Sequence, residues 1–138
     1  MPYVIKVELR EPRAPWLVHE AVRTIYSGNR IAPGDIVYLF ASETSGGAGL
    51  VARGRVTSAE PVPRRPGPGR QAPRVSLTIE RTALAKRRLG RAELRPFSSW
   101  NDGRPETELN FKFYRQATDK IGGISEAAAT FLEQYFRA

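Results

Sequence analysis

The chain has 138 residues, 41% of them hydrophobic, which is enough for one compact domain with its own core. The net charge of +8 and the pI of about 10.4 favour anionic partners, nucleic acid above all, although the arginine-rich composition of a GC-rich genome gives the same balance. The absence of cysteine excludes disulfides and thiolate metal sites, and the single histidine, His19, argues against zinc, so we expect no metal or cofactor. No apolar run approaches membrane-spanning length and no charged-then-apolar leader opens the chain, so we expect a cytoplasmic protein.

The first half of the chain predicts strands and one helix. Residues 3–9 alternate in polarity and predict a half-buried strand. Residues 16–26 place Val18, Val22 and Ile25 at helical spacing, which predicts a helix that ends at residues 27–29. After the turn at 32–35, residues 36–42 and 50–57 are rich in β-branched and aromatic side chains and predict a hairpin.

The second half begins with a stretch rich in Pro, Gly and Arg at about 61–73, which predicts a flexible basic loop, either a connector or an arm that contacts phosphates. Residues 74–82 predict a strand, 84–94 a short helical piece, 97–105 a loop, 109–115 a short strand, and Ser125 the N-cap of a final helix. Five or more strands with two or three helices predict an α+β fold, built on a small, strongly bent mixed sheet or open β-barrel. We expect residues 1–138 to form a single domain.

Three stretches, together with the order of the elements, resemble a known family. Residues 26–38 place an Asn-containing segment before a Gly-Asp strand, residues 49–56 read GLVARGRV, and residues 113–126 carry Arg115 and Gln116 ahead of a Ser-Glu pair. The pattern resembles the EVE domain of the PUA-like superfamily, which also includes ASCH and YTH domains. This chain departs from the family at Ala117, where the family has Ser, in the shortened Asn-containing run at 27–30, and in the extra proline-rich loop.

The resemblance implies binding rather than catalysis. PUA-like domains hold nucleic acids, and the YTH and EVE members enclose a modified base in an aromatic-lined pocket. Some EVE-like domains are joined to nucleases, which raises a separate nuclease chain as a candidate partner.

Candidate residues for the base pocket are flat aromatic rings and polar groups that can read a base edge. Trp16 and Trp100 are the two tryptophans, and Trp100 is predicted in a polar loop where burial is unexpected, whereas Trp16 would equally well cap one end of a barrel. Ser42 and Thr44 border a glycine-rich turn, so their hydroxyls either contact a base or serve the turn itself. The resemblance adds Asn29, which as a helix C-cap would be purely structural.

Arg115 and Gln116 have side chains suited to bidentate contacts with a base or phosphate, or to tying the last strand to the hairpin. The predicted contacts to the nucleic-acid backbone are arginines: Arg64, Arg65, Arg70, Arg87 and Arg88.

No catalytic constellation is evident in the sequence. The chain lacks cysteine, has one histidine, and its glycine cluster at 46–49 lacks the Lys-Ser/Thr of a Walker loop, so we expect a binding domain and not an enzyme. The preferred hypothesis is a nucleic-acid-binding module that recognises a modified base in DNA or RNA. Two alternatives stay open: an ASCH-like domain that binds or hydrolyses a nucleoside derivative, and a module whose basic loop meets an acidic protein.

Overall fold

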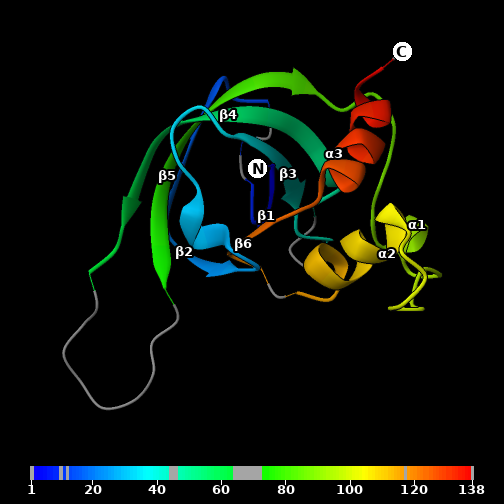
Figure 1. Cartoon of the computed structure of the whole chain (residues 1–138). Helices are drawn as coiled ribbons and strands as arrows, with labels where there is room; N and C mark the ends of the chain where they lie inside the picture. The colour runs from blue at the N-terminus through cyan, green and yellow to red at the C-terminus, as the bar shows by residue number, and fades with distance from the viewer. Residues whose placement is uncertain are drawn as a thin grey trace.

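Strands close into a barrel, and short helices cover one side of it (Figure 1). The computed structural model describes residues 2–9, 11, 13–43, 47–63, 73–116 and 118–137. Around the barrel the described strands follow the order β1 (Tyr3–Val7), β3 (Ile36–Ala41), β4 (Gly49–Pro61), β5 (Arg74–Leu84), β2 (Trp16–Ile25) and β6 (Lys120–Gly123). The β1–β3 and β2–β6 pairs are parallel and the other neighbours are antiparallel, so the sheet is mixed. The α+β barrel expected from the sequence is confirmed, and it is closed.

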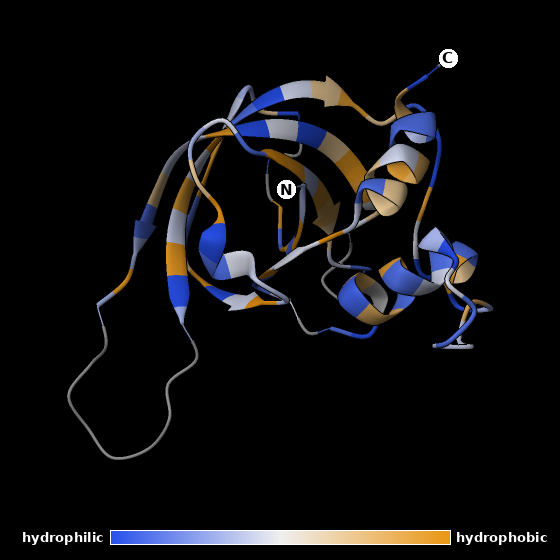
Figure 2. Ribbon diagram, viewed as in Figure 1, coloured by the Kyte–Doolittle hydropathy of each residue, from blue (hydrophilic) through white to orange (hydrophobic). Residues whose placement is uncertain are grey.

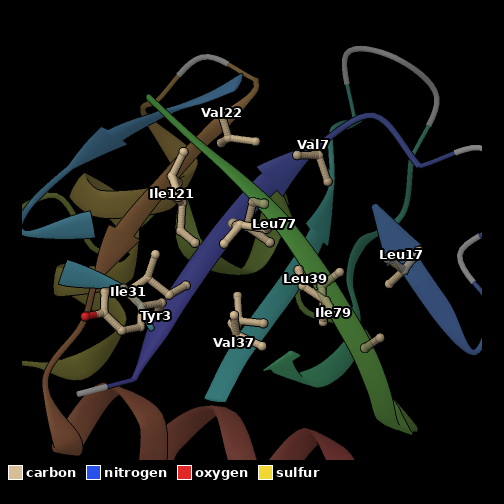
Figure 3. Close-up of a cluster of buried hydrophobic side chains, with 14 residues drawn as sticks. Tyr3, Val7, Leu17, Val22, Ile31, Val37, Leu39, Leu77, Ile79 and Ile121 are labelled. Carbon is tan, nitrogen blue, oxygen red and sulfur yellow. The ribbon is translucent and has the colours of Figure 1, made fainter. Parts of the chain in front are cut away.

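The barrel interior is a core of apolar side chains contributed by every strand (Figure 3). Hydrophilic and hydrophobic residues alternate along β4 and β5, because successive side chains of a strand point to opposite faces (Figure 2). The largest interior side chains are at most 2% exposed: Tyr3, Ile5, Leu39, Leu77, Ile79 and Ile121.

A second core lies between the outer face of the barrel and the helices. These are α1 (Arg91–Leu94), α2 (Pro105–Leu109), the π-helix η3 (Asn110–Tyr114), α3 (Glu126–Glu133) and the 3-10 helix η4 (Gln134–Phe136). Val4 of β1 and Phe40 of β3 point outward and belong to this core, and the Phe40 ring lies 3.6 Å from that of Phe113, centroid to centroid. β1 and β3 are therefore buried on both faces, which explains why residues 36–41 are continuously apolar.

The hairpin, the strand from 74 and the final helix are confirmed. β3 and β4 pair antiparallel, and β5 pairs with β4. The Ser125 hydroxyl accepts a hydrogen bond from the Ala128 amide at 3.1 Å and so caps α3, as expected. Among the described residues, every helix is too short or too polar to span a membrane.

The helix predicted over 16–26 is wrong, because this segment is strand β2. Leu17 and Val22 both face the barrel interior although they are five residues apart, which a regular strand does not allow. A bulge resolves the conflict: Ala21 has φ 53°, its amide donates to the Ser76 hydroxyl, and the pairing with β5 shifts between His19 and Val22. The bulge breaks the two-residue period that would mark a strand. Val18 is 66% exposed, so the helical spacing of Val18, Val22 and Ile25 does not correspond to one buried face. Residues 27–29 accordingly end no helix, and a 3-10 turn, η1 (Gly28–Arg30), follows β2.

The strand predicted over 109–115 is also wrong. Pro105 occupies the first turn of α2, where its missing N–H costs nothing, and the helix continues as η3. Leu109 and Phe113, four residues apart, are both buried in the second core, whereas Phe111 points elsewhere. The alternation of apolar and polar residues was therefore coincidental.

Two predicted loops have different outcomes. Residues 97–104 form no helix or strand, as expected, and α1 supplies the short helical piece predicted over 84–94. The basic loop at about 61–73 joins β4 to β5, and its residues 64–72 lie outside the described part of the chain.

Candidate nucleic-acid interface

Trp100 lies in a cavity of about 330 Å³ on the helical side of the barrel. Its ring is 79% exposed and that of Tyr26 is 49% exposed, which is unusual for large aromatic side chains. The lining residues, which we call the aromatic pocket, are Tyr26, Trp100, Gly103, Arg104, Thr107, Glu108, Phe111 and Lys112. The described residues thus bring aromatic rings from the end of β2, the 95–104 loop and η3 to one place.

The Trp100 loop is held by Asp102. One carboxylate oxygen accepts a hydrogen bond from the Arg104 amide and the other from the Thr107 hydroxyl, both at 3.0 Å. The hydrogen bond from the Arg104 amide is the main cause that lowers the pKa of Asp102, so the anion persists and the anchor is maintained at neutral pH. Gly103 has φ 71°, a conformation that favours glycine, and it completes the turn into α2.

Helix η3 is anchored by a buried amide. The Asn110 Nδ2 group donates to the Leu94 carbonyl at 2.7 Å, and its Oδ1 accepts from Arg115 Nε at 2.7 Å. This fixes the helix against α1 and orients Phe111 and Lys112 toward the aromatic pocket.

Tyr26 reaches the pocket through an unusual backbone. Tyr26 has φ 46° and Ser27 φ 66°, both in the left-handed region, and the Gly123 amide donates to the Tyr26 carbonyl at 2.9 Å. A Cβ on Gly28 would lie 2.3 Å from the Ile121 carbonyl oxygen, so only glycine lets the turn approach β6 this closely. The end of β2 is thereby turned toward η3.

The charges of the pocket are partly paired. Lys112 Nζ lies 5.3 Å from the Tyr26 ring centroid and 3.2 Å from a Glu108 carboxylate oxygen. Glu108 also accepts hydrogen bonds from the Ser125 amide at 2.7 Å and the Ser125 hydroxyl. Burial alone would raise the pKa of Glu108, but the bonds from Ser125 and the Lys112 charge together lower it, so Glu108 is an anion at neutral pH.

Arg115 and Gln116 follow η3 and lie next to the pocket. The Arg115 guanidinium stacks 4.5 Å from the centroid of Phe111 and its side chain is exposed. Gln116 is used internally: its Nε2 donates to the Phe111 carbonyl at 3.0 Å, its Oε1 accepts from Lys120 Nζ at 3.4 Å, and its backbone carbonyl accepts from Lys6 Nζ at 2.9 Å. Of the predicted pair, Arg115 is the exposed one, although its Nε donates to Asn110 Oδ1.

Ser42 is not among the residues that line the pocket. It lies at the end of β3, is 1% exposed, and its amide donates to the Val7 carbonyl at 2.9 Å. Thr44 lies outside the described residues. Asn29 is exposed in η1, the turn that follows Tyr26, but it does not line the pocket either.

Trp16 is separated from Trp100. It is 54% exposed at the start of β2, opposite Glu80 of β5. Tyr26 follows the other end of the ten-residue strand, roughly 30 Å away at the usual rise per residue. The two tryptophans therefore do not form one pocket.

The predicted backbone contacts are only partly described. Arg64, Arg65 and Arg70 lie outside the described residues. Arg88 pairs with Glu43 at 2.6 Å and Glu93 at 3.1 Å, and Arg87 donates to the Gln134 carbonyl at 2.6 Å. Both described arginines are exposed, but both also hold the fold together.

Of the lining residues, sequence reasoning named Trp100 alone as a site residue and missed the others: Tyr26, Gly103, Arg104, Thr107, Glu108, Phe111 and Lys112. The strand predicted over 109–115 would place Phe111 on the same face as Leu109 and Phe113, which lie in the second core. The i,i+4 pairs Glu108–Lys112 and Phe111–Arg115 behind a proline are helical signals that would have corrected this.

A second, larger cavity of about 590 Å³ lies between β3, β4 and α3. Two of its charged groups are paired: Glu133 pairs with Arg53 and accepts a hydrogen bond from the Tyr38 hydroxyl. The lining also includes Asp35, Arg55 and Glu126. Burial and the adjacent Glu133 carboxylate raise the pKa of Tyr38, so its phenol stays protonated. With a buried tyrosine as its aromatic residue, this cavity offers little surface for stacking. Within the described part of the chain, His, Asp and Glu side chains form no group that could hold a metal ion.

The barrel and its helical cover are similar to solved structures. The DUF55 domain of human thymocyte nuclear protein 1 matches with a TM-score of 0.66 and 14% identity, over 97% of each chain. Human THYN1 protein, solved in complex with DNA containing 5-methylcytosine, matches with a TM-score of 0.65 and 15% identity, over 99% of this chain and 98% of that one. A protein from Pseudomonas syringae matches with a TM-score of 0.62 and 18% identity, over 98% and 99%.

No protein-family model matches the chain, and no curated protein matches it in sequence. The likeness therefore rests on three-dimensional structure and covers almost the whole chain. It agrees with the resemblance seen in the sequence: this chain has the PUA-like fold of the DUF55, or EVE, domain.

Proposed function

We propose that this chain is a nucleic-acid-binding domain of the EVE type that holds a modified base in the aromatic pocket. The observation that carries the proposal is the convergence of Tyr26, Trp100 and Phe111 on one open cavity. Two of these rings remain substantially exposed, and exposed aromatic faces are what a stacking site requires. A base that enters such a pocket must first leave its own stack, so the ligand is single-stranded or has an extruded nucleotide.

The positive charges around the pocket favour an anionic polymer as the ligand. Arg104, Lys112 and the adjacent Arg115 lie within a chain of net charge +8, and Glu108 is already neutralised by Lys112. Phosphates that follow the base would meet these cations and release their counterions.

An aromatic cage for a methylated ammonium group is the main competing use of such rings. It is disfavoured because Lys112 already lies over the Tyr26 ring. A second cation at that place would be repelled, whereas a neutral base would not.

The structural comparison adds independent support. Human THYN1 protein shares the fold over almost the whole chain and was solved with DNA containing 5-methylcytosine. A methylated base is thus a reasonable first ligand, and the pocket offers the apolar contact that a methyl group favours.

The test is a fluorescence titration in which Trp100 is the reporter. Trp16→Phe leaves Trp100 as the single tryptophan, and Trp16 lies at the far end of β2, so the substitution should spare the pocket. Matched DNA and RNA oligonucleotides, single- and double-stranded, with and without 5-methylcytosine, would be titrated at two salt concentrations.

We expect quenching that saturates and favours one modified oligonucleotide. Binding that leaves Trp100 fluorescence unchanged would refute the pocket. Equal quenching by modified and unmodified strands would refute recognition of the modification. Free nucleosides added in parallel test the ASCH-like alternative, which expects tight binding or turnover with little dependence on salt.

A further inference from the structure

A row of positive charges crosses three neighbouring strands on the outer face of the barrel. Arg23 of β2 lies opposite Arg74 of β5 on one side and opposite Lys120 of β6 on the other. In each strand the adjacent residue packs in the barrel interior, so all three cations point outward. These interior neighbours are Val22, Val75 and Ile121. We call Arg74, Arg23 and Lys120 the cationic row.

Like charges at opposed positions of a sheet repel one another, and such pairs destabilise the sheet. Within the described part of the chain, no carboxylate forms a salt bridge with Arg74, Arg23 or Lys120. Even Asp119, the exposed acid that precedes Lys120, is not paired with these described cations. The barrel therefore keeps an unfavourable arrangement of charges that a bound anion would relieve.

Two members of the cationic row are positioned by neutral acceptors. Arg74 Nη1 donates to the Ala21 carbonyl at 2.8 Å, and Lys120 Nζ donates to Gln116 Oε1 at 3.4 Å. These bonds orient the side chains without cancelling their charge, and they leave further N–H groups for a ligand. Arg23 is exposed, and its side chain forms no hydrogen bond to a described residue.

The cationic row lies beside the aromatic pocket. Arg23 precedes Tyr26 by three residues, which is roughly 10 Å along an extended chain. Gln116, which accepts from Lys120, also donates to the Phe111 carbonyl at 3.0 Å. Tyr26 and Phe111 both line the pocket. A nucleic acid with one base in the pocket would therefore have its neighbouring phosphates within reach of the row.

We infer that the cationic row binds the phosphate backbone of a nucleic acid, so that the bound strand crosses β5, β2 and β6 next to the aromatic pocket. This inference rests on the proposed function, because it takes the ligand to be a nucleic acid. Adjacent strands of a sheet are about 4.8 Å apart, so the row spans about 10 Å. Over that length one strand of B-form DNA presents about three phosphates.

An acidic protein segment is the competing ligand for such a row. It would neutralise the same charges, but it lacks the flat bases that the neighbouring aromatic rings are suited to stack. The sequence next to the row is basic as well: residues 61–73, which precede Arg74, include three arginines and no acid. We therefore take nucleic acid as the ligand and use an acidic polypeptide as a competitor in the test.

The test compares two double variants that lose the same charge. Arg23→Gln/Lys120→Gln, the row variant, removes two cations of the row. Arg55→Gln/Arg137→Gln, the control variant, removes two exposed arginines from β4 and from the residue after η4. A labelled oligonucleotide of about ten nucleotides is titrated at several salt concentrations and followed by fluorescence anisotropy.

We expect the row variant to bind at least about tenfold more weakly than the parent at about 0.1 M salt. The slope of log K against log salt should fall by about two, one for each lost phosphate contact, whereas the control variant should keep a slope close to that of the parent. Arg23→Lys/Lys120→Arg keeps both charges and should retain the parent slope. Urea unfolding checks the fold, and Arg23→Gln alone, at an exposed position, should still lower the slope by about one if the row variant does not fold.

The outcomes separate this inference from the proposed function. A folded row variant with the affinity and salt slope of the parent would overturn the inference, and so would equal losses in the row and control variants. Poly-glutamate that competes as well as an unlabelled oligonucleotide of equal charge would overturn nucleic acid as the ligand of the row. A lowered slope in the row variant, with no quenching of Trp100 by any oligonucleotide, would support the row and refute the aromatic pocket.

Discussion

The barrel interior buries its apolar side chains, whereas the aromatic pocket leaves large aromatic side chains exposed. Inside the barrel, side chains such as Leu39 and Ile79 are fully buried and contribute to stability. In the pocket, Trp100 and Tyr26 keep much of their surface in water. Exposed aromatic surface gives up burial energy, and under the proposed function a ligand supplies the missing contact.

The barrel interior and the aromatic pocket also come from different parts of the chain. The pocket is built mainly by the segment between β5 and β6, with Tyr26 as the contribution of the barrel. That segment makes its own local anchors, Asp102 for the loop and Asn110 for η3. Stability and ligand binding should therefore respond to different substitutions.

The largest expected effect is on the barrel side of the comparison. Leu77→Ala removes a side chain that is 2% exposed in the barrel interior and should lower the free energy of unfolding by about 2–5 kcal/mol. Urea unfolding followed by circular dichroism measures it. At a temperature where the variant is folded, its affinity for the preferred oligonucleotide should match the parent. A folded variant that had lost Trp100 quenching would show that the two regions are coupled.

Trp100→Ala should have the reverse pattern. Loss of one stacked base contact should weaken oligonucleotide binding by about 1–3 kcal/mol, measured by fluorescence anisotropy of a labelled strand. The free energy of unfolding should change by no more than about 0.5 kcal/mol, because the ring is exposed. Trp16→Ala is the matched control, an exposed tryptophan on a distant part of β2. Equal losses of affinity in both variants would mean that neither ring marks the site.

The same contrast explains what the sequence could predict. β3 and β4 follow from their content of β-branched and aromatic residues, and β5 follows from regular alternation, although the β3–β4 and β4–β5 pairings contain register shifts. β2 was missed since a single residue, Ala21, in a left-handed conformation, resets the alternation. Whether such a bulge forms depends on the pairing with the partner strand. The local sequence pattern of β2 carries no information about that pairing.

Of the residues that line the pocket, the sequence singled out Trp100 alone, for a similar reason. Trp100 could be singled out because a tryptophan in a polar loop has no core to join. Its companions come from a helix that was interpreted as a strand and from the end of a strand that was interpreted as a helix. Ser42 was a candidate through its place beside a glycine-rich turn and Asn29 through the resemblance, and the described pocket includes neither.

Ser125→Ala tests the link between the final helix and the pocket. It removes the cap on the Ala128 amide and one of the bonds to Glu108, and should cost about 1 kcal/mol of stability by urea unfolding. Because Glu108 holds Lys112, oligonucleotide binding should also weaken slightly. Ser125→Thr keeps the hydroxyl and should behave like the parent. A Thr variant as unstable as the Ala variant would argue against the cap.

The smallest expected effect is on the pH dependence of the barrel. His19 follows Leu17 on the inward-facing side of β2, and its Nε2 is buried without a hydrogen-bond partner among the described residues. Burial lowers the pKa of His19, an effect that the nearby Asp119 charge only partly offsets. The folded state therefore resists protonation more than the unfolded state does. Stability should be complete above about pH 6.5 and should fall as the pH drops below it.

This dependence can be assigned without ambiguity, because His19 is the single histidine of the chain. Urea midpoints at pH 7.5 and pH 5.5 should differ for the parent and converge for His19→Gln. The pocket should not contribute in this range, since the lowered pKa of Glu108 keeps it ionised until the solution is far more acidic. The imidazole resonance in proton NMR gives the pKa directly. A value at or above that of free histidine would contradict a buried, neutral ring and would place His19 in contact with water or with an acidic partner.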